Sequence, residues 1–325
     1  MLICINTILS PVTIECDCFS SSYHENNMLP IISIANRGSL ITETGFGSYD
    51  LCINPYVGCQ FGCTYCYVRF FVKDDNNPWG QFVRLRNHIN DKLSRELHKL
   101  VGRKLVIGTM TDPYQPAEKT HNLTRTVLQM IDASEHKPTE IGLFTRSPLV
   151  KRDIDLLVKL NVRIHLTITP FPAHILRKIE PISVRTESRF QLLDFLKKSG
   201  LKTHVSISPV LPIYSEEFTE YFAKKMAEIQ PDGFTIDPMQ VYGESFDATD
   251  AVLNDDVHWK DVTDIIRNKN RYKEWKSAYR LSWENAWRPF IDLPVLPIGM
   301  DHELKTRFDL RTGDRIDFKN FRYPQ

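Results

Sequence analysis

Three cysteines, Cys59, Cys63 and Cys66, lie in one short stretch of this 325-residue chain. Thiolates spaced this closely must share a loop, and such a loop can wrap them around one inorganic centre. A structural zinc ion or an electron-transfer cluster usually has four protein ligands. No further cysteine follows Cys66. The stretch therefore predicts a centre with three protein ligands and an open coordination position where a reactant can bind.

The residues around the cysteines indicate where this loop should lie. The run Leu51–Pro55 before it predicts a strand, and α/β proteins place their chemistry at the carboxyl ends of such strands. Gly58 and Gly62 have no Cβ, so we expect the backbone there to pass close to the bound centre. Cys52 lies upstream, on the strand itself, and is not expected to be a ligand.

The elements that must position the loop alternate along the chain. Strands are predicted at 51–55, 105–108, 141–144, 162–168, 203–207 and 233–236. Helices are predicted at 122–133, 151–160 and 216–229, with further helical segments up to residue 198. This alternation favours parallel strands joined by right-handed crossovers, which is an α/β fold.

Composition narrows the class of protein. Hydrophobic residues make up 42% and charged residues 25%, which is typical of a globular domain. The net charge of +1 gives no overall field that selects nucleic acid, membrane or an anionic substrate. Seven cysteines, an odd number in a long chain, favour a reducing cytoplasm over a disulfide framework. No apolar run of about 18 residues is present, so no membrane partner is expected.

The Cys-x3-Cys-x2-Cys spacing, with Tyr65 just before the third cysteine, resembles the signature of the radical S-adenosylmethionine (SAM) enzymes. The longer string from Asn54 to Tyr67 resembles the branch related to spore photoproduct lyase. The resemblance implies that the three cysteines hold a [4Fe-4S] cluster and that SAM binds the fourth iron. It also implies that a one-electron donor of the flavodoxin or ferredoxin type drives cleavage of SAM. The resulting 5′-deoxyadenosyl radical would take a hydrogen atom from the substrate.

The resemblance also implies a fold and a division of the chain. The radical SAM core would be an open (β/α)6 partial TIM barrel over residues 48–239. Residues 1–47 would form an N-terminal extension and a loop leading into the core. Residues 240–325 would form a mainly helical C-terminal extension that packs on the barrel.

In such a barrel, functional side chains should follow each strand. After the second strand, the string from Gly108 to Pro116 resembles this branch and corresponds to the stretch that accepts the SAM amine. The resemblance makes Thr109, Thr111 and Asp112 candidate SAM contacts. The alternative is a proline-stiffened turn in which Asp112 caps a helix.

Other candidates follow later strands. Arg146 stands where relatives often carry a lysine that contacts the SAM carboxylate, and its fork can bind a carboxylate bidentately. The alternative is an exposed arginine in a surface ion pair. Ser206 and Ser208 could reach the ribose or methionine of SAM, or could be small polar fillers. Glu180, Arg185 and Arg189 suit either a structural salt bridge or a SAM contact.

One departure from the family pattern bears on the reaction. Spore photoproduct lyase proper carries, after its second strand, a cysteine that returns a hydrogen atom to the product radical. Thr109 to Thr111 occupy that region here, and a threonine O–H bond is too strong for this donation. Repair by that route is therefore not expected. Tyr65 and Tyr67 flank Cys66 and are candidate catalytic residues for a hydrogen relay, with packing under the cluster as the alternative.

The C-terminal region has a different pattern. Residues 261–288 are predicted to be helical, and their aromatic residues step by three or four along one face: Tyr272, Trp275, Tyr279, Trp283 and Trp287. This regular stripe favours packing on the barrel. The alternative is a nucleic-acid surface, in which interleaved basic residues bind phosphates and the aromatics stack on bases.

Two functions follow from these patterns. The first is a lyase-like radical SAM enzyme of unknown substrate, with nucleic acid expected by family analogy. The second is a non-catalytic interaction module that holds zinc on the same three cysteines.

Overall fold

A seven-stranded sheet is the centre of the fold in the computed structural model, which describes residues 31–35, 38–46, 48–239 and 243–287. Its strand order is β10-β9-β8-β7-β6-β3-β2. The six parallel strands are β3 (Leu51–Ile53), β6 (Lys104–Ile107), β7 (Glu140–Thr145), β8 (Arg163–Thr167), β9 (Lys202–Val210) and β10 (Gly233–Pro238). β2 (Ile41–Glu43) pairs antiparallel with β3 at the edge. Six parallel strands in sequence order confirm the predicted partial barrel. Predictions for residues 1–30 lie outside the described ranges.

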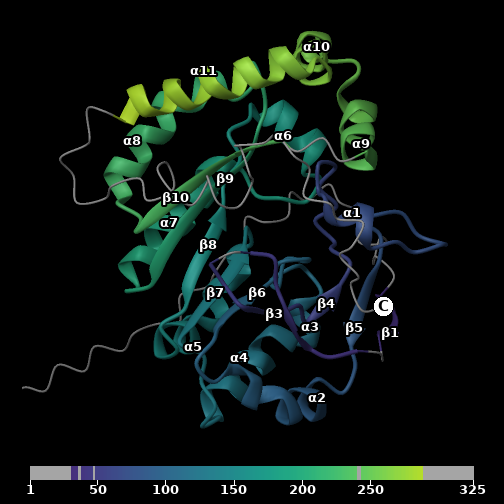
Figure 1. The fold of residues 1–325 in the computed structure, drawn as a ribbon, viewed down its shortest axis with the longest axis vertical. Helices are drawn as coiled ribbons and strands as arrows, with labels where there is room; N and C mark the ends of the chain where they lie inside the picture. The colour runs from purple at the N-terminus through teal and green to yellow at the C-terminus, as the bar shows by residue number, and fades with distance from the viewer. Residues whose placement is uncertain (1–30, 36–37, 47, 240–242, 288–325) are drawn as a thin grey trace, which may run out of the picture.

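Helices follow the parallel strands and cover the outer face of the sheet (Figure 1). The longer ones are α2 (Ile89–Glu96), α4 (Leu123–Ala133), α5 (Ile154–Lys159), α7 (Thr186–Lys198) and α8 (Thr219–Ile229). Shorter helices are α1 (Val68–Phe71), α3 (Glu118–His121) and α6 (Ala173–Ile179), with 3₁₀ turns at Leu97–Leu100, Pro148–Asp153 and Glu216–Phe218. α4, α5 and α8 end close to where sequence periodicity placed them, because each has an apolar face that the sheet buries.

Successive side chains of a strand point to opposite faces of the sheet, and the two faces carry different kinds of residue. Apolar residues such as Leu143 and Leu166 are fully buried in the main core with the helices. The opposite face lines the barrel interior and carries Phe144, His165 and His204 at matching register positions. The His165 ring stacks on Phe144, with 4.4 Å between ring centroids. The barrel interior therefore has an aromatic and polar lining.

A second, three-stranded sheet lies beside the barrel (Figure 1). It consists of β1 (Ile31–Ala35), β5 (Val83–Arg86) and β4 (Tyr56–Val57), in the order β1-β5-β4. β5 therefore belongs to this sheet rather than to the barrel. Because β4 directly precedes the cysteines, this sheet supports the start of the cysteine loop.

Three helices follow the barrel: α9 (Gly243–Leu253), α10 (Trp259–Arg267) and α11 (Lys269–Trp287). The single helix predicted over 261–288 is wrong, because the chain is extended at Asn268. The Asn268 side-chain oxygen accepts hydrogen bonds from the backbone N–H groups of Asn270 and Arg271 at 3.1 Å, so it begins a new helix there. No sequence pattern predicted α9. None of the helices in the described part of the chain is long and apolar enough to cross a membrane.

The aromatic stripe of α11 packs into the protein. Trp275, Tyr279 and Trp283 are buried and belong to the main core, and α11 lies against α8 (Figure 1). The Tyr272 hydroxyl donates a hydrogen bond to the backbone carbonyl of Met239 at the end of the barrel. The packing interpretation of the stripe is confirmed for these side chains. The side chain of Trp287 lies outside the described set.

Candidate functional site

The cysteine loop follows β4 and precedes α1, beyond the carboxyl end of β3. Cys59 and Cys63 are buried, Cys66 is half-buried, and all three are free thiols. They pack with Phe61, Tyr65 and other apolar side chains in one small cluster. Burial raises the pKa of each thiol to about 12, and negative charge on a neighbouring cysteine contributes at each. The three thiols are therefore close enough to influence one another electrostatically.

Among the described residues, no group of three His, Cys, Asp or Glu side chains is arranged to hold one metal ion. Cys52 is buried on β3 with Thr42 Oγ1 3.2 Å from its sulfur, and it packs with Tyr49 and Val106. It lies apart from the other three, as predicted.

Gly58 and Gly62 each occupy a place in the loop where a Cβ would crowd neighbouring protein atoms. Gly58 has φ +87°, and a Cβ there would lie 2.6 Å from the backbone oxygen of Phe82. Gly62 has φ +61°, and a Cβ there would lie 3.2 Å from Gly80 Cα. Both glycines adopt the left-handed backbone region and are crowded by protein backbone, and their expected closeness to a bound centre stays a prediction. They shape the loop against the segment that leads into β5.

The end of β6 is tied to the end of β3 through Asn54, which sequence reasoning did not single out. Asn54 Nδ2 donates to the Thr109 hydroxyl at 3.1 Å, and Asn54 Oδ1 accepts from the Met110 N–H at 2.8 Å. The Tyr67 hydroxyl donates to the Thr109 carbonyl at 2.6 Å. Thr109 is therefore held directly beside the cysteine loop. The only sequence signal for Asn54 was its place at the start of the family-like string.

Asp112 has a structural role at the same edge. Its oxygens accept hydrogen bonds from the Tyr114 N–H, the Thr145 hydroxyl and the Arg146 N–H at 2.8–2.9 Å. Burial raises the pKa of this carboxyl in spite of those bonds. The hydrogen bond from the Tyr114 N–H closes a local turn at Asp112, as the alternative interpretation of this string as a proline-stiffened turn predicted. Asp112 also fastens the end of β7 to the loop after β6.

Thr111 is directed into the protein. Its hydroxyl donates to the Gly58 carbonyl and accepts from Gln115 Nε2, each at 2.8 Å. Both its donor and an acceptor position are used, and the residue is buried. The structure does not bring Thr111 to an open site, and its role is to fasten the cysteine loop.

Arg146 reaches the cysteine loop from the end of β7. Its Nη1 lies 3.2 Å from Cys63 Sγ, 2.7 Å from the Tyr65 hydroxyl and 2.9 Å from Glu180 Oε1. The side chain is only 15% exposed, so the surface ion-pair alternative is wrong. Among the described residues, Nε and Nη2 make no hydrogen bond or ion pair. One edge of the guanidinium therefore stays available to a ligand.

Glu180 holds the side chains of Arg146 and Tyr65 in place. The carboxylate accepts from the Tyr65 hydroxyl, from Thr169 Oγ1 at 3.1 Å and from Arg189 Nη2. The side chains of Glu180 and Arg189 are both 0% exposed. Burial disfavours the ionised carboxylate, but the guanidiniums of Arg189 and Arg146 lower the pKa of Glu180 to about 2. The sequence allowed either a salt bridge or a SAM contact in this segment, and the structure shows a salt bridge between Glu180 and Arg189.

The two serines of β9 lie on the inner face of the barrel. Ser206 is buried and stands in register with Thr167 on β8 and Thr235 on β10. Ser208 is half-buried and precedes Pro209 across a cis peptide bond. Neither hydroxyl makes a hydrogen bond within the described residues. Their predicted contact with SAM stays a prediction.

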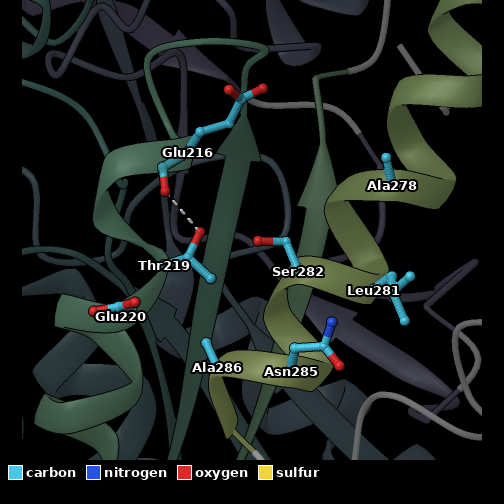
Figure 2. A pocket seen from close by; sticks show the side chains of 8 residues that line it. All are labelled: Glu216, Thr219, Glu220, Ala278, Leu281, Ser282, Asn285 and Ala286. Atoms are coloured by element: carbon cyan, nitrogen blue, oxygen red, sulfur yellow. Dashed lines mark hydrogen bonds between the residues drawn. The ribbon is translucent and has the colours of Figure 1, made fainter.

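A pocket of about 490 Å³ lies away from the cysteines, between α11 and the turn that begins α8 (Figure 2). Its lining residues are Glu216, Thr219, Glu220, Ala278, Leu281, Ser282, Asn285 and Ala286. Glu216 Oε1 already accepts from Trp275 Nε1 at 3.2 Å, and the Thr219 hydroxyl donates to the Glu216 carbonyl at 2.9 Å. These polar groups serve the packing of α11 on α8, and no predicted site residue lines the pocket.

Comparisons with known proteins agree with this geometry. The family model described as the Radical SAM superfamily matches residues 53–226. An uncharacterised protein of Methanocaldococcus jannaschii is 35% identical over 189 residues, which cover 58% of this chain and 70% of that protein. An uncharacterised protein of Mycobacterium tuberculosis is 28% identical over 195 residues, which cover 56% of each protein. The chain thus aligns with little more than half of the mycobacterial relative.

Solved structures show a shared fold. A mutant of spore photoproduct lyase with dinucleoside spore photoproduct has a TM-score of 0.60 and 12% identity, covering 81% of this chain and 80% of that one. Another mutant, with bound S-adenosylmethionine and the same dinucleoside, has a TM-score of 0.59, 12% identity and the same coverage. The family match spans more than half of the chain and includes all three loop cysteines. This protein belongs to the radical SAM superfamily.

Proposed function

We propose that this protein is a radical SAM enzyme in which Cys59, Cys63 and Cys66 hold a [4Fe-4S] cluster. The observation that carries the proposal is the packing of three free thiols on one loop, two buried and one half-buried, with Arg146 beside them. When bound, the cluster supplies the electron that cleaves SAM, and the radical formed takes a hydrogen atom from the substrate. A flavodoxin- or ferredoxin-type protein is the proposed electron donor. The free thiols suit the reducing cytoplasm.

The groups around the loop would orient SAM. The unused Nε and Nη2 edge of Arg146 has the geometry to take the SAM carboxylate bidentately. The Thr109 hydroxyl accepts one hydrogen bond from Asn54 and retains a second acceptor position for the SAM amine. Ser206 and Ser208, on the inner face of β9, would contact the ribose or the methionine. Asp112 and Thr111 would support these contacts indirectly, because their own polar atoms are already bonded within the protein.

Tyr65 and Tyr67 are the proposed hydrogen-relay residues. The Tyr67 hydroxyl donates to the Thr109 carbonyl, and the Tyr65 hydroxyl donates to Glu180 while accepting from Arg146. These bonds fix the hydroxyl groups of both tyrosines, which flank Cys66 in the sequence. Replacing each with phenylalanine would remove the transferable hydrogen but keep the packing. Loss of substrate turnover with retained SAM cleavage would support the relay.

Nucleic acid is the proposed substrate class. Its support is the shared fold with spore photoproduct lyase structures that contain a dinucleoside photoproduct, which is an argument by analogy. On α11, Arg271 and Lys273 are exposed, and the half-buried Lys276 lies 4.7 Å from the Tyr272 ring centroid. Binding of single-stranded DNA or RNA should fall steeply with salt and weaken when these three basic residues are replaced together. Absence of binding at low salt would point to a small molecule or peptide instead.

Metal analysis tests the cluster assignment against the zinc alternative. After anaerobic purification, we expect iron and acid-labile sulfide with brown absorbance, and their loss in Cys63→Ala. Colourless protein that contains zinc would favour the interaction module.

A further inference from the structure

Within the described chain, one nitrogen of Arg146 makes all the hydrogen bonds and the ion pair that its side chain forms. Nη1 reaches Cys63 Sγ at 3.2 Å, the Tyr65 hydroxyl at 2.7 Å and Glu180 Oε1 at 2.9 Å. A SAM carboxylate would use the other edge of the guanidinium, formed by Nε and Nη2. The Nη1 contact with sulfur is therefore a separate feature that carboxylate binding does not explain.

The position of Nη1 is fixed from two sides. The Arg146 backbone N–H donates to Asp112 at 2.9 Å, which holds the main chain at the end of β7. Glu180, itself paired with Arg189, holds the guanidinium through its carboxylate. An arginine guanidinium is not deprotonated in proteins. The group beside the sulfur is thus a permanent, positioned cation.

We propose that Arg146, held by Glu180, donates a charge-assisted N–H···S hydrogen bond to the Cys63 thiolate and raises the reduction potential of the cluster. The inference rests on the proposed function. Reduction adds one electron from the external donor, so the reduced state carries one more negative charge. A cation and a hydrogen-bond donor at a ligating sulfur stabilise that state more than the oxidised one. Arg146 then makes the electron easier to deliver, independently of any contact with SAM.

The test is a redox titration of the anaerobically reconstituted full-length protein without SAM, with the reduced cluster followed by electron paramagnetic resonance. Arg146→Gln should shift the midpoint potential to a more negative value, because it removes the charge. Arg146→Lys should shift it less, because the charge stays but the planar fork is lost. Glu180→Gln should shift it in the opposite direction, because it removes a buried negative charge next to Arg146. Arg163→Gln is the matched control, since Arg163 pairs with Glu140 at 2.9 Å at the opposite end of the barrel.

Each outcome decides between the two proposals. Iron and sulfide content is measured first, and a wild-type protein that assembles no cluster overturns the proposed function together with this inference. A cluster that assembles with equal potentials in wild type and Arg146→Gln overturns this inference alone. If Arg146→Gln fails to hold a cluster, Arg146→Lys and Glu180→Gln decide. Opposite shifts support the inference, and two unchanged potentials overturn it.

Discussion

Glu180 and Arg189 form an ion pair in which neither side chain is exposed to solvent. The same carboxylate holds Arg146 and accepts from the Tyr65 hydroxyl, so the pair connects the segment after β8 to the cysteine loop. We expect Glu180→Gln to lower the free energy of unfolding by about 3–5 kcal/mol, because Arg189 would keep a buried charge without its partner. Urea denaturation of the metal-free protein measures this.

The matched control for that change is Glu140→Gln. Glu140 also pairs with an arginine, Arg163, but both side chains are more than a quarter exposed. A solvent-exposed pair contributes about 0–1 kcal/mol, so this variant should unfold close to wild type. An equal loss of unfolding free energy in the two variants would mean that burial does not make the Glu180 pair more important for stability than the Glu140 pair.

The same carboxylate predicts a dependence of stability on pH. The pKa of Glu180 is lowered to about 2 from an ordinary value of 4.5. A depressed pKa in the folded state contributes stability that is present above the unfolded pKa and is lost as pH falls towards the folded one. We expect the unfolding free energy of wild type to fall between about pH 5 and pH 2. Glu180→Gln should show a shallower fall, and identical slopes would argue against an ionised Glu180.

Arg146→Ala is expected to weaken SAM binding while the iron content stays unchanged. It removes a charged donor from a site that is only 15% exposed but removes no iron ligand. Loss of such a charged hydrogen bond costs about 1.5–3 kcal/mol, which corresponds to roughly 10- to 150-fold in affinity. Equilibrium binding of SAM to the reconstituted protein measures the effect, with Arg163→Ala as the control. Unchanged affinity would remove Arg146 from the SAM site.

The aromatic stripe of α11 gives a prediction about stability. Trp283 is 1% exposed and meets Phe222 of α8 edge to face, with ring centroids 5.8 Å apart. Trp283→Ala should cost about 3–5 kcal/mol of unfolding free energy, as expected for removal of a buried aromatic side chain. Leu281→Ala, on the exposed side of the same helix, should cost little. A small loss for Trp283→Ala would contradict the role of α11 as part of the core.

Much of the fold could be predicted because its signals are local. The six barrel strands and their helices follow from hydrophobic periodicity, and the loop cysteines from their spacing. The break at Asn268 was missed although asparagine is a good helix N-cap, because the regular aromatic stripe begins only at Tyr272, after the break. Periodicity reports which face is buried and says little about where one helix ends and the next begins.

The contacts within the site could not be predicted in the same way. The contact between Gly58 and Phe82 was not predicted, because nothing local in the sequence shows that these two residues meet. Arg146, Glu180 and Arg189 come from separate segments, and only the folded barrel brings them together. The sequence identified each as a candidate but could not show that one buried carboxylate joins both arginines. Tertiary pairing of charges carries no periodic signature.

The most direct test of the central assignment is formation of 5′-deoxyadenosine from SAM. The reconstituted protein is incubated anaerobically with SAM and dithionite, alongside Cys63→Ala and Cys52→Ala. We predict 5′-deoxyadenosine from wild type and Cys52→Ala, because Cys52 lies apart on β3, and none from Cys63→Ala. No 5′-deoxyadenosine from an iron-loaded wild type, or an undiminished yield from Cys63→Ala, would contradict the assignment.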